Sequence, residues 1–333
     1  MFGEDMKLRE LAQSLRDFEG VTRKRAIGPL VKWFAADLSS GNFGEDAAVI
    51  ERGDESLLIA ADGIWSKLMD ADPEWAGYCA VLVNIHDILA MGGTPLAMVD
   101  VFSANSTEIC NRVLAGMSEA TKKFGVPVVG GHVHPDTAYN ALDVAIIGTV
   151  KTDSIIYSSG AEEGHDVLIA VDMDGRVHPS CTLCWDTTTM KHPEVIRAQL
   201  QAMPRIARRR LATAGKDISN PGMIGTLGML LEVSEAGAFV ELDQIPIPDG
   251  MDMDLWLRMY PGMGFVLTAR PKDVREIANI FDDAGMVTAK IGEITDSRKL
   301  EIGCGTERVV MWDFAHDAIM GIDAATRRAN QPM

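Results

Sequence analysis

The sequence predicts an α+β fold in two domains. With 333 residues, 47% of them hydrophobic and 24% charged, the chain can bury two cores of ordinary size. Runs with helical spacing and runs typical of strands follow each other without the strict alternation of a doubly wound sheet. The pattern loosens over residues 151–164, so we expect one domain over residues 1–152 and another over residues 153–333.

Hydrophobic spacing predicts the elements of the first half. Leu8, Leu11 and Leu15 recur at helical intervals, and a Gly53-Asp54 turn between two short apolar runs indicates a hairpin. A long apolar segment ends at Gly92-Gly93, which is typical of a helix C-terminus. We expect two helices within residues 1–38, helices over 73–91 and 107–124, and strands over 47–50, 56–61, 96–103, 126–129 and 142–150.

The second half begins with an apolar run typical of a strand, over residues 166–171. A polar stretch over residues 172–193 is expected to form a loop. Beyond it we expect helices over 194–213, 221–236 and 271–284, and strands over 238–242, 264–269 and 287–294.

Charge and composition limit the classes of partner. A net charge of −17 disfavours nucleic acid and anionic membranes, and it repels a nucleotide triphosphate unless cations bridge the two. The chain has no run of 18 apolar residues, and its first ten residues lack the apolar segment of a signal peptide. Five sparse cysteines indicate a reducing compartment rather than a disulfide scaffold. We therefore expect a cytoplasmic protein with neither a nucleic acid nor a membrane as partner.

Three carboxylates stand at unusual positions in the first half. Asp46 precedes an apolar strand, Asp62 ends the next one, and Asp87 lies in a segment that is apolar nearly all round. A buried carboxylate is costly unless it is paired or binds a metal. Asn84 shares a helix face with Asp87, and Mg²⁺ prefers such oxygen ligands. Taken one by one, a turn residue, a strand-end residue and an internally paired residue remain the simpler interpretations.

Two further segments carry polar residues next to apolar runs. Gly130-Gly131-His132 follows an expected strand, where glycines permit a sharp turn or a close approach to a ligand. Asp217 and Ser219 precede an apolar helix, whose N-terminus favours anions. Ser219 or Asn220 also suits the N-cap of that helix, so capping alone accounts for them without a ligand.

A basic cluster and a cysteine pair leave alternatives open. Arg23-Lys24-Arg25 reaches phosphates or an acidic substrate in one interpretation; a solvated patch is the favoured one. Cys181 and Cys184 have the spacing of a metal or redox motif, but one CxxC without further ligands is weak, and an incidental surface pair is favoured.

These segments, in this order, resemble the superfamily of aminoimidazole-ribonucleotide (AIR) synthetase, thiamine-monophosphate kinase, selenophosphate synthetase and the hydrogenase-maturation ATPase. The similarity is most specific over residues 84–92, and residues 44–50, 60–63, 130–132, 159–164, 217–219 and 291–294 extend it over nearly the whole chain. Residues 19–24, 71–79, 185–191 and 215–221 are similar to the AIR-synthase-related family called methanogenesis marker protein 2, which implies a methanogenic archaeon.

The resemblance implies a homodimer in which the first domain gives strands to a β-barrel between subunits and the second domain is an α/β sandwich. It also implies ATP and Mg²⁺ as cofactors. By motif position, Asp46, Asp62, Asp87 and Asp217 would be metal ligands. The residues expected to bind the nucleotide are Asn84, Gly130, Gly131, His132 and Ser219.

The departures from the superfamily leave the reaction open. No reactive cysteine lies in a glycine-rich N-terminal segment, and Ser158 stands where thiamine-monophosphate kinase has an arginine. We expect an ATP-dependent kinase or synthetase that phosphorylates an oxygen of a small molecule. The alternatives are a phosphotransferase like thiamine-monophosphate kinase, a nucleotide-binding assembly factor without catalysis, or a CxxC metal or redox protein.

Overall fold

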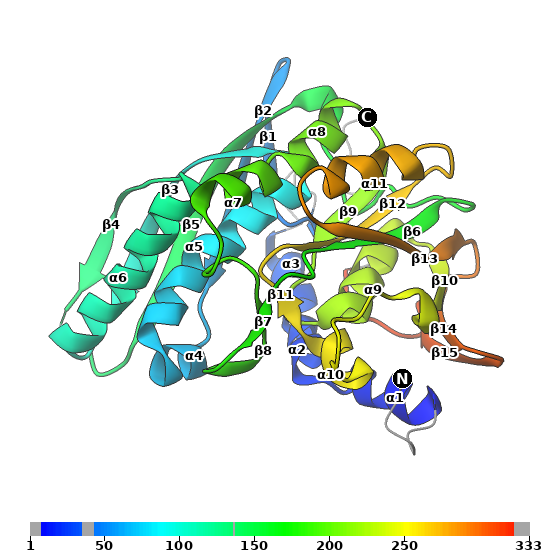
Figure 1. The fold of residues 1–333 in the computed structure, drawn as a ribbon, viewed down its shortest axis with the longest axis horizontal. Coiled ribbons are helices and arrows are strands. Elements are labelled where there is room, and N and C mark those ends of the chain that lie inside the picture. Colours follow the sequence, from blue (N-terminus) through cyan, green and yellow to red (C-terminus); the bar gives the residue numbers. More distant parts are fainter. Residues whose placement is uncertain (1–7, 35–42, 136, 323–333) are drawn as a thin grey trace.

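The computed structural model describes residues 8–34, 43–135 and 137–322 (Figure 1). Within them, a five-stranded sheet and a seven-stranded sheet are each covered by helices, and a small three-stranded sheet lies apart. The chain is therefore an α+β protein, as its pattern predicts. No helix among these residues is long and apolar enough to cross a membrane.

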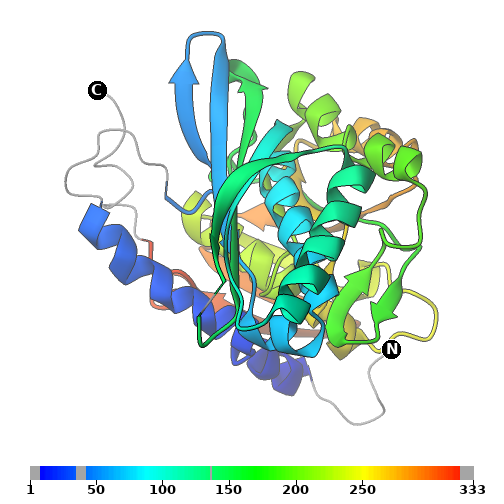
Figure 2. The same cartoon turned by 90° about the vertical axis from the view of Figure 1, so that its left-hand side faces the viewer.

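The five-stranded sheet has the order β1-β2-β5-β3-β4 and is antiparallel except for the β3–β4 pair. Helices α5 and α6 lie side by side over one face, as Figures 1 and 2 show together. The opposite face exposes apolar residues, among them Val101 and Val129. The sheet's elements are β1 (Ala48–Arg52), β2 (Glu55–Gly63), α5 (Pro73–Ala90), β3 (Thr94–Ser103), α6 (Thr107–Phe124), β4 (Val128–His134) and β5 (Ala141–Lys151).

The seven-stranded sheet has the order β15-β14-β10-β13-β6-β12-β9. Strand β6, between β13 and β12, is buried on both faces: Ile169 packs in a cluster with α9, and Leu168 packs in another with α8 and α11. The strands are β6 (Asp166–Val171), β9 (Ala212–Asp217), β10 (Gly237–Glu241), β12 (Gly264–Ala269), β13 (Val287–Thr295), β14 (Lys299–Cys304) and β15 (Glu307–Asp313). The helices are α7 (Pro193–Gln199), α8 (Ala202–Arg208), α9 (Gly222–Ser234), α10 (Met253–Arg258) and α11 (Val274–Asp282).

The N-terminal helices pack against the second sheet rather than the first. They are α1 (Leu8–Arg16), α2 (Glu19–Thr22), the 3₁₀ turn η1 (Arg23–Ala26) and α3 (Ile27–Phe34). The apolar side of α1, with Leu11 and Leu15, is buried in the cluster that contains Trp312 of β15. Arg16 adds an ion pair of 3.0 Å to Asp317. The turn η1 is thereby held beside the junction of the two large sheets.

Helix α5 connects the two halves. Its side chains belong to the same buried cluster as Phe265 and Leu267 of β12. The ring of His86, near its C-terminus, lies 5.8 Å from the Phe265 ring. Because α5 also contacts β2 and β9, its last two turns stand between the ends of strands from both sheets.

Several expected elements are corrected by the structure. The expected polar loop over residues 172–193 contains β7 (Arg176–His178) and β8 (Cys181–Asp186), which form the small sheet with β11 (Tyr260–Pro261). The expected helix over residues 194–213 is two short helices followed by β9. Strands β14 and β15 had no expected counterpart. The strand expected over residues 126–129 starts later and runs through the glycines to His134.

Candidate functional site

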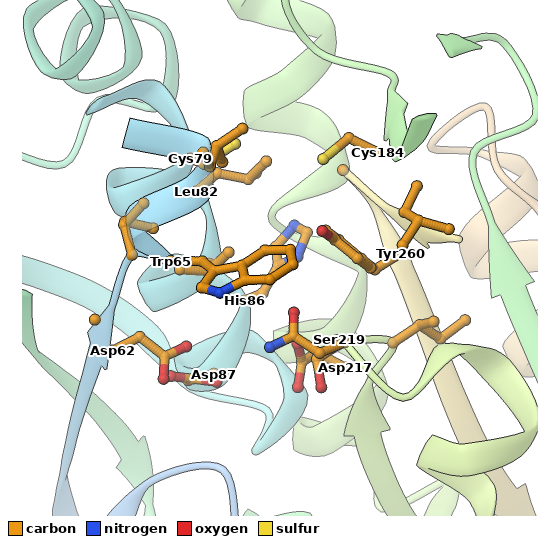
Figure 3. A pocket seen from close by; sticks show the side chains of 18 of the residues that line it. Asp62, Trp65, Cys79, Leu82, His86, Asp87, Cys184, Asp217, Ser219 and Tyr260 are labelled. Atoms are coloured by element: carbon orange, nitrogen blue, oxygen red, sulfur yellow. The ribbon is translucent and has the colours of Figure 1, made fainter. Parts of the chain in front are cut away.

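A cavity of about 680 Å³ lies where the two halves meet (Figure 3). Its walls come from η1, the end of β2, α5, β8, the end of β9 and β11. Asp46, Asp62, Asp87 and Asp217 all line it. The structure therefore brings together the four aspartates that the sequence singles out, although they are distant along the chain.

The positions of these aspartates follow from local structure. Asp62 is the penultimate residue of β2, and Asp217 is the last residue of β9. Asp87 faces them from the last turns of α5, where only 9% of its surface is exposed. Asp46 lies in the turn before β1. Strand ends and a helix end from both halves therefore direct their carboxylates into one space (Figure 3).

Burial and mutual repulsion make this end of the cavity unfavourable for several negative charges. Burial raises the pKa of Asp87 well above its ordinary value, and the charges of Asp62, Asp217 and Asp46 add to the effect. Burial and then Asp46 raise the pKa of Asp217 to about 8. Asp62 is open to the solvent of the cavity, yet the protein encloses it enough that burial raises its pKa as well. A cation in this space would relieve the repulsion.

The protein supplies one buried cation here. Lys216, from β9, forms an ion pair with Asp46, and their side chains are only 4% and 7% exposed. The ammonium group also donates to the Gly44 carbonyl at 3.1 Å and to the Ser158 hydroxyl at 3.3 Å. Burial lowers the pKa of Lys216, but Asp46 and Glu45 outweigh it and keep the group charged. The second oxygen of Asp46, Oδ2, is buried without a hydrogen-bond partner among the described residues.

The donor set fits Mg²⁺ shared with a phosphate better than a cage made by protein alone. Among the described residues, no three His, Cys, Asp or Glu side chains converge closely enough to hold one ion by themselves. Mg²⁺ is usually bound by one or two carboxylates, with water and substrate phosphates completing its shell. The unpartnered Asp46 Oδ2 and the crowded carboxylates of Asp87 and Asp217 offer oxygen ligands of that kind.

Ser219 also lines the cavity, but not as a helix cap. Helix α9 starts at Gly222 after Pro221, and no side chain caps it, so the expected capping by Ser219 or Asn220 is wrong. The Ser219 carbonyl instead accepts from the Gly222 backbone N–H at 2.8 Å.

The other expected nucleotide-binding residues lie outside the cavity walls. Asn84 is fully buried within α5, and its Nδ2 donates to the Ala80 carbonyl at 2.8 Å. Gly130, Gly131 and His132 are exposed residues of the edge strand β4, so their interpretation as a loop after a strand is wrong. A Cβ on Gly131 would lie 2.4 Å from Asp100 Oδ1, so packing against Asp100 accounts for a glycine at this position. Contact of these four residues with a nucleotide stays a prediction.

The basic cluster belongs to the cavity. Arg23 and Lys24 line it, and the Arg23 guanidinium lies 5.4 Å from the centre of the Trp65 ring. Arg23 is exposed and Lys24 partly exposed there, so the favoured solvated patch forms part of the cavity wall. The signal that could have found them is their isolation, because they form the one basic cluster of an acidic N-terminal half.

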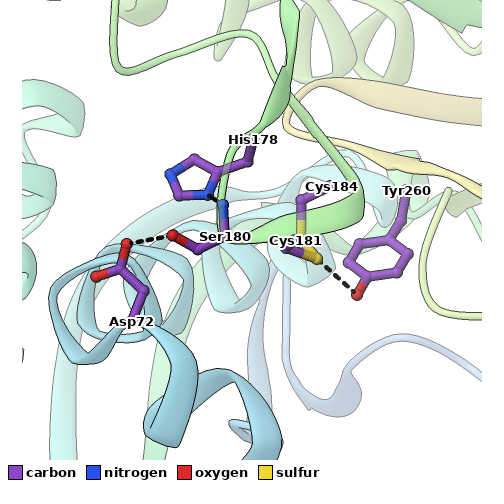
Figure 4. Close-up of a disulfide and its surroundings, with 6 residues drawn as sticks. All are labelled: Asp72, His178, Ser180, Cys181, Cys184 and Tyr260. Atoms are coloured by element: carbon purple, nitrogen blue, oxygen red, sulfur yellow. Dashed lines mark hydrogen bonds between the residues drawn. A yellow bond between two sulfur atoms is a disulfide. The ribbon is translucent and has the colours of Figure 1, made fainter.

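The cysteine pair forms part of the cavity wall as well. Cys181 and Cys184 are joined by a disulfide within β8, and Cys184 is buried (Figure 4). The Tyr260 hydroxyl lies 3.8 Å from Cys181 Sγ (Figure 4). The favoured interpretation as an incidental surface pair is wrong. His178, on the neighbouring strand, stacks on Trp75 at 4.1 Å and accepts from the Ser180 backbone N–H, which occupies its Nδ1.

Fold and site together define a class of α+β proteins with a carboxylate-lined cavity between two halves. Family models agree: residues 44–150 match the N-terminal domain of AIR synthase related proteins, and residues 153–305 match the C-terminal domain. The chain belongs to the AIR synthase related family. A relative with 47% identity over 326 residues is an uncharacterized protein of Methanocaldococcus jannaschii, and the match covers 95% of this chain and all of that one.

Solved structures share the fold. PurL of Thermotoga maritima in complex with ATP has a TM-score of 0.74 at 18% identity, and the match covers 94% of this chain and 52% of that one. The chain thus spans about half of PurL. The structure described as AaThiL complexed with AMPPCP and TMP has a TM-score of 0.66 at 17% identity, with 92% of this chain and 98% of that one covered.

Proposed function

We propose that this protein binds ATP with Mg²⁺ in the cavity and transfers the γ-phosphoryl group to an oxygen of a small molecule. The observation that carries the proposal is the convergence of Asp46, Asp62, Asp87 and Asp217 on one cavity. Four carboxylates that line one cavity repel a polyphosphate unless divalent cations lie between them. ATP in PurL and AMPPCP in AaThiL support a nucleotide as the ligand.

Each residue at the carboxylate end has a role in this proposal. The four aspartates hold Mg²⁺, which neutralises the charge of the phosphates and orients them when bound. Lys216 holds Asp46 in place through their ion pair. Ser219 and Lys24, on the cavity wall, supply a hydroxyl and an ammonium group for the phosphates.

The proposed reaction is a phosphoryl transfer. An oxygen of the small molecule forms a bond to the γ-phosphorus while the bond from that phosphorus to the bridging oxygen breaks, and ADP leaves with the bond electrons. Positioning and electrostatic stabilisation carry most of the catalysis in reactions of this type. This is the work that a preformed cluster of carboxylates and cations is suited to do.

We also propose a homodimer formed through the open face of the five-stranded sheet. Val99, Val101 and Val129 are 45%, 48% and 65% exposed on neighbouring strands β3 and β4. A group of exposed apolar side chains on one sheet face is typical of an interface. Closing such sheets from two subunits would give the barrel that the resemblance implies, and it would place Gly130, Gly131 and His132 at the interface.

Calorimetry tests the nucleotide proposal. Wild type is expected to bind AMPPCP only when Mg²⁺ is present, and Asp87→Asn is expected to weaken binding at least about tenfold, because a charged metal ligand is lost. Asp54→Asn, in the exposed hairpin turn, is the control and is expected to bind as wild type does. Binding that is equal with and without Mg²⁺ would contradict the proposal. Tight binding without turnover of any candidate acceptor would favour the assembly factor instead.

A further inference from the structure

The cavity has a second end, away from the carboxylates that are proposed to hold Mg²⁺ and the phosphates. We propose that this end is the acceptor subsite and that it takes a small molecule in which a flat unsaturated ring carries an oxyanion, either a carboxylate or a phosphate monoester. The inference rests on the proposed function and specifies the class of its second substrate.

The two ends differ sharply in chemistry. Asp62, Asp87 and Asp217 occupy one end, and Cys79, Leu82 and Cys184 occupy the other, with Trp65, His86 and Tyr260 between them (Figure 3). None of the residues labelled at the second end carries a carboxylate, so this end offers no ligand for a metal ion that would hold phosphates. Ligand sites commonly combine such an apolar surface with a few polar groups that fix orientation.

Two aromatic residues from different halves of the molecule border this end. Trp65 follows β2, and Tyr260 starts β11 on the opposite wall (Figure 3). Both are partly exposed to the cavity. The Trp65 ring has the Lys67 ammonium group 4.4 Å from its centre and the Arg23 guanidinium 5.4 Å away. A flat ring between Trp65 and Tyr260 would contact aromatic surface on both sides, which is favourable for stacking.

Arg23 supplies the charge that selects an anion. It lines the cavity, and it has no ion pair or hydrogen bond with any described residue. Its charge also acts on the second aromatic residue: burial raises the pKa of Tyr260 to about 12, and Arg23 opposes that rise. A guanidinium next to the Trp65 ring, in the cavity that Tyr260 also lines, matches a carboxylate or phosphate attached to a stacked ring.

The same charge distinguishes the acceptor from the nucleotide base. All the negative charge of ATP lies on its phosphates, which the carboxylate end would hold through Mg²⁺, and adenine is neutral. An arginine beside the aromatic residues therefore forms no ion pair with adenine but attracts a second, anionic substrate. Lys24, the next residue, lines the cavity as well, so the basic segment continues along the wall.

The test uses phenyl phosphate and benzoate as probes, with cyclohexyl phosphate as the probe without a flat ring. Each is titrated calorimetrically into the full-length protein, with and without saturating Mg²⁺ and AMPPCP. Phenyl phosphate or benzoate is expected to bind wild type, and phenyl phosphate is expected to bind better than cyclohexyl phosphate. Arg23→Gln is expected to lower the affinity for whichever probe binds wild type by about tenfold or more, because a charge-assisted contact is lost. Arg25→Gln, outside the cavity wall, is its matched control.

Trp65→Leu separates the acceptor from adenine. It is expected to remove the preference for the flat probe while AMPPCP affinity changes less than about threefold. Trp33→Leu is its control, since Trp33 is 84% exposed on α3. The proposal is overturned if wild type binds neither phenyl phosphate nor benzoate, or if Trp65→Leu weakens AMPPCP as strongly as the probe. Failure of AMPPCP itself to bind wild type would refute the nucleotide proposal. The titrations of the probes without nucleotide would still test the acceptor subsite.

Discussion

Lys216 and Asp46 form an ion pair across the junction of the two halves, from the second-last residue of β9 to the turn before β1. Breaking a buried pair from one side leaves an uncompensated charge. The stability of the protein therefore depends on the charges of the residues that line the cavity.

Lys216→Met is expected to destabilise the metal-free protein by about 3–5 kcal/mol, because Asp46 then remains buried among three other aspartates. Urea unfolding measures the change, and Mg²⁺ is expected to restore part of the loss. Lys299→Met is the control, since the Lys299–Asp313 pair is 41% and 29% exposed and worth about 1 kcal/mol or less. Equal effects of the two substitutions would contradict a special role for the buried pair.

The metal-free protein is expected to lose stability as the pH rises. The pKa of Asp217 is about 8 in the folded chain, against 3.8 ordinarily, because burial and Asp46 oppose its ionisation. The unfolded chain therefore releases this proton first, and the free energy of unfolding falls from about pH 4 to about pH 8. Urea unfolding in EDTA at pH 5 and pH 8 measures the slope.

Asp217→Asn should remove part of that slope and raise the stability of the metal-free protein at pH 8. A gain of about 1 kcal/mol would raise the Tm by about 2–4 °C in a domain of roughly 150–250 residues. Asp54→Asn, exposed in the hairpin turn, should leave the slope unchanged. An unchanged slope in Asp217→Asn would show that this carboxyl is not held protonated in the absence of metal.

Val101→Asp is expected to convert the proposed dimer into a monomer. The substitution puts a charge into the apolar face of the five-stranded sheet, where Val101 is 48% exposed. Light scattering after gel filtration measures the mass. Val310→Asp, 46% exposed on β15 of the other sheet, is the matched control and should leave the mass unaltered. A wild-type protein that is already monomeric at micromolar concentration would refute the dimer.

A count of free thiols tests the disulfide between Cys181 and Cys184. Of the five cysteines, Cys181 and Cys184 share a disulfide, so protein purified without reductant should show three free thiols, and five after reduction. In Cys181→Ser, Cys184 has no partner and four thiols are expected before reduction. Five thiols in the unreduced wild type would mean that the bond does not form under the conditions of purification.

Part of this site could be predicted from sequence because burying a charge is costly. Asp87 lies in a segment that is apolar nearly all round, so a partner or a metal had to be inferred, and the structure puts it among carboxylates. Asp62 stands out for a similar reason, at the end of an apolar strand. Helices α5 and α6 were also predictable within one residue, because their caps and spacing agree.

The rest depends on tertiary placement that local pattern does not contain. Arg23 reaches the cavity because α1 docks on the distant strand β15, and Cys181 reaches it because β8 pairs with β11, about 75 residues later. Gly130 and Gly131 suggested a loop, since glycine is unfavourable in strands, yet they continue β4, and Gly131 makes room for Asp100. In each case, the position of the residue depends on contacts with segments that are distant in the sequence.

The most direct test of the account is a crystal structure with AMPPCP and Mn²⁺ in place of Mg²⁺, with the metal located by anomalous scattering. We predict metal peaks at coordination distance from Asp46, Asp62, Asp87 or Asp217, each also touching a phosphate oxygen. Nucleotide and metal bound elsewhere, with these four carboxylates facing only water, would contradict it.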